Sequence, residues 1–128
     1  MHKFELRVYY EDTDLAGIVY YANYLKFIER GRTEYVRSIG IDQVELKESE
    51  GIVFAVRHLE ADYLAPAMFD DELVVETEVV SMSGVWLVLQ QDVVRDGARL
   101  FSARVTLVAL GENGQPARLP ADIRRKMH

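Results

Sequence analysis

The sequence predicts an α+β fold in which a long helix is wrapped by a five-stranded antiparallel sheet. Three observations lead to this prediction. The chain opens with a strand pattern, one long amphipathic helix pattern follows, and four further strand patterns come after it, joined by turn signals. Strands that follow one another through short turns pair antiparallel. Because one helix can cover only one face of this sheet, we also expect the protein to be at least a dimer.

Length and composition limit the classes of protein. The 128 residues support one domain, which we expect to span residues 1–128. The absence of cysteine excludes disulfides, cysteine-ligated metals and thiol nucleophiles. The net charge of −6 gives no electrostatic reason to bind nucleic acid. Residues 1–7 lack the apolar core of a secretion signal, and no apolar run is long enough to span a membrane. We therefore expect a cytoplasmic protein without stable membrane insertion.

The first strand is predicted over residues 4–10, where Phe4, Leu6 and Val8 face one side and the residues between them face the other. Residues 11–17 break this alternation with Asp-Thr-Asp and then a glycine, which is typical of a loop. We therefore expect a loop between the first strand and the helix.

The long helix is predicted over residues 22–39. Its apolar and small residues recur every three or four positions and form one stripe: Tyr24, Ile28, Gly31, Tyr35 and Ile39. A glycine inside a helix costs about 1 kcal/mol relative to alanine. Gly31 therefore indicates that the helix backbone closely approaches the surface on which it packs. Gly40 follows the helix and is expected to cap it, because glycine adopts a positive φ at low cost.

The remaining elements follow from alternation and turn signals. A shorter helix is predicted over residues 42–49. Four strands are predicted over residues 52–63, 72–82, 85–95 and 98–110. Asp96-Gly97 between the last two strands is a strong hairpin signal. The tail over residues 119–124 is expected to be a surface turn.

The loop before the long helix contains two carboxylates, Asp12 and Asp14. The start of a helix presents unpaired N–H groups and a partial positive charge, which stabilise a carbonyl oxygen that gains negative charge. A carboxylate held nearby can attack that carbonyl or activate a water molecule. This pattern suits acyl transfer without a serine, a cysteine or a metal.

Other roles for these carboxylates stay open. An aspartate in a loop before a helix is often a turn or capping residue. A pair of aspartates can also bind Mg²⁺ or Ca²⁺. However, no phosphate-binding loop accompanies the pair and no third carboxylate lies close in the sequence, so we expect no metal and no cofactor. We expect Asp12 to organise the loop rather than act as a second catalyst, and Thr13 to support it.

The same segment resembles the signature of the hotdog-fold acyl-CoA thioesterases. The residues that carry the resemblance are Asp12-Thr13-Asp14-Leu15-Ala16-Gly17-Ile18-Val19-Tyr20, Asn23-Tyr24, Phe27, Glu29 and Arg32. Residues 62–67, followed by residues 70–73, resemble the turn between the second and third strands of that family. The resemblance covers nearly the whole chain. It is closest to the 4-hydroxybenzoyl-CoA thioesterase type, which includes the Tol–Pal-associated (YbgC-like) thioesterases.

The resemblance implies a role for individual residues. Asp14 matches the catalytic carboxylate, which acts as nucleophile or as general base. The backbone N–H of Tyr21 matches the group that polarises the thioester carbonyl. Gly17, Ile18, Val19 and Tyr24 match positions that contact the substrate. Tyr20, Tyr24 and Tyr35 are candidates for an acyl pocket, although aromatic residues at helical spacing more often belong to a core.

The implied function is hydrolysis of acyl-CoA thioesters to a free carboxylic acid and CoA, with acyl-carrier protein as an alternative donor. The resemblance also implies a homo-oligomer, either a dimer or a dimer of dimers (homotetramer). Basic residues suit the phosphates of CoA. The candidates are Lys26, Arg30, Arg57, Arg95, Arg99 and Arg124-Arg125-Lys126.

Two alternatives are a non-catalytic module that binds acyl-CoA or acyl-carrier protein, and a hotdog hydratase or dehydratase. Hotdog hydratases and dehydratases work with a catalytic histidine beside a carboxylate. The Asp-Thr-Asp segment contains no histidine, although His58 lies on a predicted strand and is expected to be structural.

Overall fold

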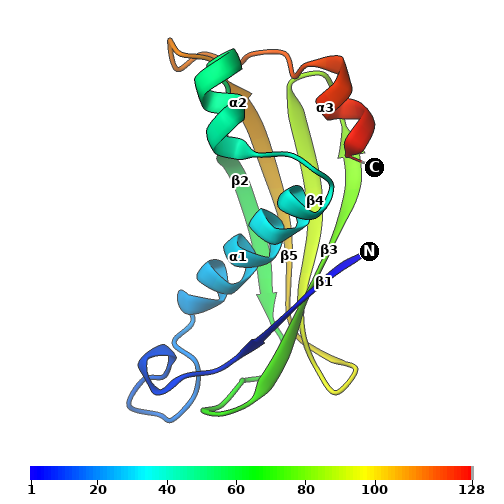
Figure 1. Ribbon diagram of the computed structural model, residues 1–128. Coiled ribbons are helices and arrows are strands. Elements are labelled where there is room, and N and C mark those ends of the chain that lie inside the picture. Colours follow the sequence, from blue (N-terminus) through cyan, green and yellow to red (C-terminus); the bar gives the residue numbers. More distant parts are fainter. Residues whose placement is uncertain (128) are drawn as a thin grey trace.

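The computed structural model describes residues 1–127 and contains a five-stranded antiparallel sheet that curves around a long helix (Figure 1). The strands are β1 (His2–Arg7), β2 (Val53–Tyr63), β3 (Glu72–Met82), β4 (Trp86–Arg95) and β5 (Ala98–Leu110), in the spatial order β1-β3-β4-β5-β2. The helices are α1 (Asn23–Ser38), α2 (Gln43–Glu50) and α3 (Ala121–Lys126), and a 3₁₀ turn, η1, covers Tyr10–Asp12. The predicted α+β architecture is confirmed. No helix in this part of the chain is long and apolar enough to cross a membrane.

The stripe predicted for α1 faces the sheet. Tyr24, Ile28, Gly31 and Tyr35 are buried, and Ile39 is partly buried against the same core. Two further residues of α1, Phe27 and Val36, are also buried, so the apolar face is wider than the predicted stripe. This face packs on inward-pointing residues of the central strands, among them Leu73, Val75, Leu87, Leu89, Phe101 and Val105.

Gly31 brings the backbone of α1 into close contact with β3. A Cβ atom built on Gly31 would overlap Cγ1 of Val75 and would lie 3.0 Å from its Cβ. The close approach that the sequence predicts is therefore confirmed.

A buried polar cluster joins the same helix to the sheet. The side-chain amide of Gln91 donates to the backbone oxygen of Ile28 (2.9 Å) and to Oγ1 of Thr77 (2.9 Å). Arg32 donates to the other end of that amide, Oε1 of Gln91 (3.4 Å). Gln91 and Thr77 are fully buried, so these bonds satisfy polar atoms that water cannot reach.

The first strand differs from its prediction. It covers His2–Arg7 rather than residues 4–10, and η1 follows it. The carboxylate of Asp12 accepts a hydrogen bond from the N–H of Tyr9 (2.8 Å). This bond turns the chain out of the sheet before residue 10.

The prediction of a surface turn over residues 119–124 is wrong, because this segment contains α3. Ile123 in α3 is buried, as are Leu119 before the helix and Met127 just after it, so the tail packs on the core. The N–H of Leu119 donates to the oxygen of Gly84 in the β3–β4 turn (2.8 Å), which ties the tail to the sheet.

The other boundaries agree with the sequence patterns. Strands β3 and β5 coincide with their predicted ranges, and β2 and β4 each begin one residue later. Helix α1 is one residue shorter at each end, and α2 lies one residue further along the chain than predicted. Asp96 and Gly97 both have positive φ (50° and 82°), as a tight hairpin requires. Gly40, just past the end of α1, also has a positive φ (85°).

Replacing Gly31 tests the close contact between α1 and β3. Gly31→Ala is expected to lower the free energy of unfolding by about 1–3 kcal/mol, although alanine favours a helix by about 1 kcal/mol over glycine. The reason is that the added methyl group meets the stiff Val75 side chain. Urea denaturation measures the change. In a double-mutant cycle, Val75→Ala should relieve part of the loss, and a Gly31→Ala variant more stable than the parent would contradict the packing argument.

Candidate active site

Asp14 lies at the start of a tight turn in the loop between η1 and α1. Its N–H donates to the oxygen of Ile18 (3.0 Å), and its oxygen accepts from the N–H of Gly17 (3.0 Å). One carboxylate oxygen, Oδ1, accepts from the N–H of Ala16 (2.9 Å). Gly17 has a φ of 81°, which is why a glycine stands at this point of the turn. Asp14 is exposed in the single chain.

Asp12 and Thr13 organise the loop, as predicted. The backbone oxygen of Asp12 accepts from the N–H of Tyr20 (2.9 Å) and from the side-chain amide of Asn23 (2.9 Å). The hydroxyl of Thr13 donates to the oxygen of Tyr10 (2.7 Å). The loop is therefore held at both ends and is attached to the first residue of α1.

The start of α1 keeps unpaired donors. The N-cap residue is Ala22, which has no side chain to cap the helix. Within residues 1–127, the N–H groups of Tyr21 and Ala22 donate to no oxygen atom. The oxygen of Tyr21, by contrast, accepts from the hydroxyl of Tyr63 (2.8 Å). Unpaired N–H groups at a helix start attract a carbonyl oxygen or an anion.

An apolar hollow of about 350 Å³ lies beside this helix start. Predicted site residues from the loop and from α1 line one side of it: Ile18, Val19, Tyr21 and Tyr24. The end of β2 and the turn after it line the other side: Tyr63, Leu64, Ala65 and Pro66. The sequence analysis assigned these last four residues to the turn between the second and third strands, through the resemblance of residues 62–67, but not to the site. Neither Asp14 nor Gly17 is a lining residue.

The loop and the turn after β2 are bonded to each other. The N–H of Val19 donates to the oxygen of Ala67 (2.8 Å). The N–H of Ala67 in turn donates to the hydroxyl oxygen of Tyr24 (3.0 Å). The ring of Tyr24 stacks on Phe101, with 5.0 Å between the centroids, and burial raises the pKa of its hydroxyl. The two walls of the hollow therefore hold a fixed position relative to each other.

The three tyrosines proposed for a pocket have different surroundings. Tyr24 lines the hollow, whereas Tyr20 is exposed. Tyr35 is buried beside His2, with 6.0 Å between the ring centroids, and does not line the hollow.

An ion pair secures the turn that follows the hollow. The carboxylate of Asp71 accepts from the N–H of Met68 (2.8 Å) and from the guanidinium of Arg95 (2.6 Å). Partial burial favours a higher pKa for Asp71, but these two hydrogen bonds and the charge of Arg95 outweigh burial and hold that pKa below its usual value. Arg95, one of the basic residues suggested for the phosphates of CoA, is therefore already paired with a carboxylate.

His58 lies in the middle of β2 and is exposed. The acidic group beside its imidazole is Glu60, with Nε2 and Oε1 3.4 Å apart. No ion pair joins His58 to Asp14 within the described chain. A histidine–carboxylate pair of the hydratase type is therefore not formed at the loop by one chain.

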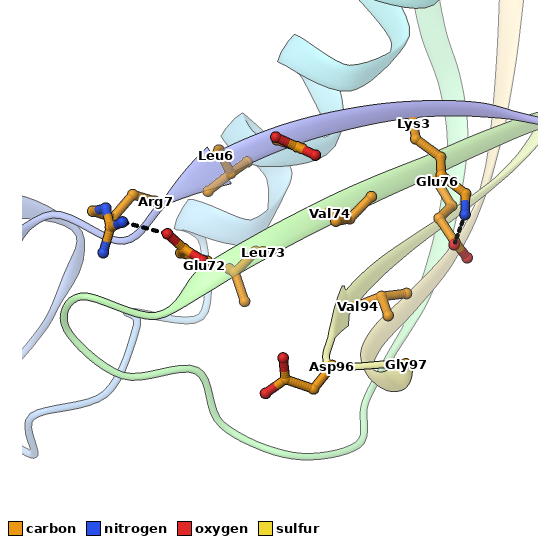
Figure 2. Close-up of a pocket in the computed structure, with 11 residues that line it drawn as sticks. Lys3, Leu6, Arg7, Glu72, Leu73, Val74, Glu76, Val94, Asp96 and Gly97 are labelled. Atoms are coloured by element: carbon orange, nitrogen blue, oxygen red, sulfur yellow. Dashed lines mark hydrogen bonds and ion pairs between the residues drawn. The ribbon is translucent and has the colours of Figure 1, made fainter.

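A second hollow, of about 570 Å³, covers the outer face of β1 and β3 (Figure 2). Two ion pairs cross it, one between Lys3 and Glu76 (3.8 Å) and the other between Arg7 and Glu72. Its basic side chains are thus neutralised by neighbouring carboxylates. It contains no residue of the Asp-Thr-Asp loop, and we do not regard it as the site.

Comparisons with known proteins show the family to which the chain belongs. The model of the thioesterase superfamily matches residues 16–102. A relative named acyl-CoA thioesterase YbgC, from Haemophilus influenzae, is 41% identical over 127 residues, which cover 98% of this chain and 93% of the relative. A probable thioesterase from Bartonella henselae has a similar structure, with a TM-score of 0.89 and 38% identity over 93% of this chain and 98% of that chain.

A structural similarity at lower sequence identity supports the fold alone. The crystal structure of a mutant 4-hydroxybenzoyl-CoA thioesterase, in complex with 4-hydroxybenzoyl-CoA, is 23% identical to this chain. Its TM-score is 0.92, over 98% of this chain and 97% of that chain. The predicted hotdog fold is confirmed by these structures.

The Asp71–Arg95 pair predicts a specific acid sensitivity. A carboxylate whose pKa is lowered in the folded state contributes stability above its unfolded pKa of about 3.9, and this contribution is lost as the pH falls through the lower folded value. Asp71→Asn should cost roughly 1 kcal/mol of unfolding free energy at pH 7 and flatten the pH dependence of stability in acid. Thermal unfolding at pH 7 and in acid measures both effects. The control is Asp70→Asn at the more exposed pair with Arg7, and an unchanged acid slope in Asp71→Asn would refute the assignment.

Proposed function

Because the chain belongs to the thioesterase superfamily, we propose that it hydrolyses acyl-CoA thioesters to a free carboxylic acid and CoA. One observation carries the proposal. Ile18 and Val19, from the loop that contains Asp14, line the same apolar hollow as Tyr21, whose N–H group is unpaired within the described chain. An acyl group fits such a hollow because it is apolar, while its thioester carbonyl needs hydrogen-bond donors.

In the proposed mechanism the hollow binds the acyl group, the N–H of Tyr21 binds the thioester oxygen, and Asp14 acts as base or nucleophile. The acyl group lies in the apolar hollow beside Tyr63, and the N–H of Tyr21 donates to the thioester oxygen. As general base, Asp14 takes a proton from water while the water oxygen bonds to the carbonyl carbon. The C–S bond then breaks, and the thiolate of CoA takes up the proton. As nucleophile, Asp14 itself bonds to that carbon, and the C–S bond breaks to release the thiolate of CoA and leave an anhydride. Water then cleaves the anhydride, which returns the Asp14 carboxylate, gives the free acid and supplies the proton that the thiolate takes up.

We propose that the protein works as a homo-oligomer, either a dimer or a dimer of dimers. Strand β2 pairs with β5 on one side and lies at an edge of the sheet on the other. Val53 and Val56 on this edge strand are exposed in the single chain (37% and 47%). An open edge with apolar side chains favours pairing with a second chain. A partner subunit would also cover Asp14, which one chain leaves exposed.

Two other readings are retained as outcomes of the tests below. A non-catalytic module would bind acyl-CoA or acyl-carrier protein in the hollow without cleaving it. A hydratase or dehydratase would depend on His58 and would change the absorbance of an enoyl thioester. The position of His58 beside Glu60 gives no support to the second reading.

Replacing the proposed catalytic carboxylate tests the mechanism. Asp14→Asn should keep the fold, because an amide oxygen can still accept from Ala16, but should lower kcat by at least ~100-fold. Release of free thiol is measured with short aliphatic, long aliphatic and hydroxy-aromatic CoA esters. The control is Asp122→Asn in α3, at the opposite end of the molecule (Figure 1). Full activity of Asp14→Asn on every ester would rule out this role for Asp14.

The same ester panel separates an enzyme from a binding module. We expect thiol release from at least one ester, together with a ligand-dependent rise in Tm. A rise in Tm without release of thiol would favour the binding module, and acyl-carrier protein thioesters would show whether the donor is the carrier protein rather than CoA.

A further inference from the structure

The carbonyl oxygen of Tyr21 receives a hydrogen bond from a side chain distant in the sequence. Tyr63, at the end of β2, donates its hydroxyl to this oxygen over 2.8 Å. The carbonyl of Tyr21 and the N–H of Ala22 belong to one peptide unit, which is planar. A hydrogen bond to the oxygen therefore also fixes the direction of that N–H.

The N-cap residue of α1 has no side chain that could bind the first N–H groups of the helix. Helices commonly begin with a serine, threonine, aspartate or asparagine whose side chain binds the first N–H groups. Here the N-cap is Ala22, and within the described part of the chain its N–H and that of Tyr21 have no acceptor. The N–H groups of Tyr21 and Ala22 thus remain available to a ligand, and Tyr63 holds the Tyr21–Ala22 peptide from its carbonyl side.

The ring of Tyr63 is itself held by three aromatic neighbours. Its centroid lies 5.0 Å from Phe101, 5.5 Å from Tyr24 and 6.2 Å from Tyr21, in edge-to-face arrangements. Tyr63 also pairs with Phe101 across the ladder between β2 and β5. These contacts aim the hydroxyl at Tyr21. Burial raises the pKa of this hydroxyl, so it remains a donor throughout the neutral range.

We propose that Tyr63 is a positioning residue of the hydrolysis, which holds the Tyr21–Ala22 peptide so that the N–H of Ala22 joins the N–H of Tyr21 as a donor to the thioester oxygen. A hydrogen bond accepted by a peptide oxygen also polarises that peptide and strengthens its N–H as a donor. Because these donors are needed most when the oxygen carries negative charge, the effect falls on the transition state rather than on substrate binding. This inference rests on the proposed thioesterase function.

The test is Tyr63→Phe, which removes the hydroxyl and keeps the ring in the aromatic cluster. We expect kcat to fall about tenfold, the worth of one net hydrogen bond of the stronger kind, with KM unchanged and Tm close to that of the parent. A purely structural role would lower Tm or change KM as well. The control is Tyr10→Phe, whose exposed side chain makes no hydrogen bond to the described residues and lies outside the hollow.

A spectroscopic measurement reports on the hydrogen bond without any need for activity. Tyr21–Ala22 is the single Tyr-Ala pair in the sequence, so carbonyl-¹³C tyrosine combined with ¹⁵N alanine gives one unique NMR signal. Tyr63→Phe should move the Tyr21 carbonyl resonance upfield, and Tyr10→Phe should leave it in place. An unmoved resonance in Tyr63→Phe overturns the proposal.

The kinetic outcomes separate the two proposals. If the parent cleaves a thioester and Tyr63→Phe cleaves it with the same kcat, the positioning role is wrong while the proposed function stands. If the parent and all variants release no thiol from any ester, the proposed function fails, and the positioning role in hydrolysis fails with it. A moved resonance and a lower kcat at constant KM support both.

Discussion

The contact between Gly31 and Val75 sets how deeply α1 lies in the curve of the sheet, and the rest of the structure depends on that depth. Because the side chain at position 31 is missing, the helix backbone rests on β3, and the neighbouring residues Phe27 and Ile28 reach into the core. The buried amide of Gln91 adds a fixed polar link between β4 and the backbone of the same helix. A helix held at two kinds of contact cannot slide along the sheet, so its first turn has a defined position.

Because the first turn of α1 has a defined position, the N–H groups beside it can be directed at a bound ligand. The loop from Asp12 to Tyr20 is attached to α1 through Asn23, and to the turn after β2 through Val19 and Ala67. Within the described chain the N–H groups of Tyr21 and Ala22, just before α1, have no acceptor. This costs some stability and preserves donors for a ligand. The site is thus built mainly from backbone groups whose direction the surrounding packing decides.

Most of the fold was predictable because it follows from local rules. The alternation in residues 72–82 and 98–110, the Asp96-Gly97 turn and the stripe of α1 each depend on residues near one another in the sequence. The tail was misjudged because α3 is only six residues long and buries one of them, Ile123, which is too short a pattern to distinguish a helix from a turn. The end of β1 was misjudged because Asp12 turns the chain through a single side-chain bond to Tyr9, which alternation does not reveal.

The sequence by itself determined the element order, the close contact that the long helix makes at Gly31, and the loop with Asp14. Each of these depends on residues near one another in the sequence, whose spacing predicts the local structure directly. Only the tertiary structure decided which side chains meet across the chain. Tyr63 reaches the oxygen of Tyr21, Ala67 bonds to Tyr24, and Arg95 pairs with Asp71 rather than remaining free for a ligand. These partners lie 24 to 43 residues apart. Their meeting depends on the strand order and register, and no local pattern encodes that geometry.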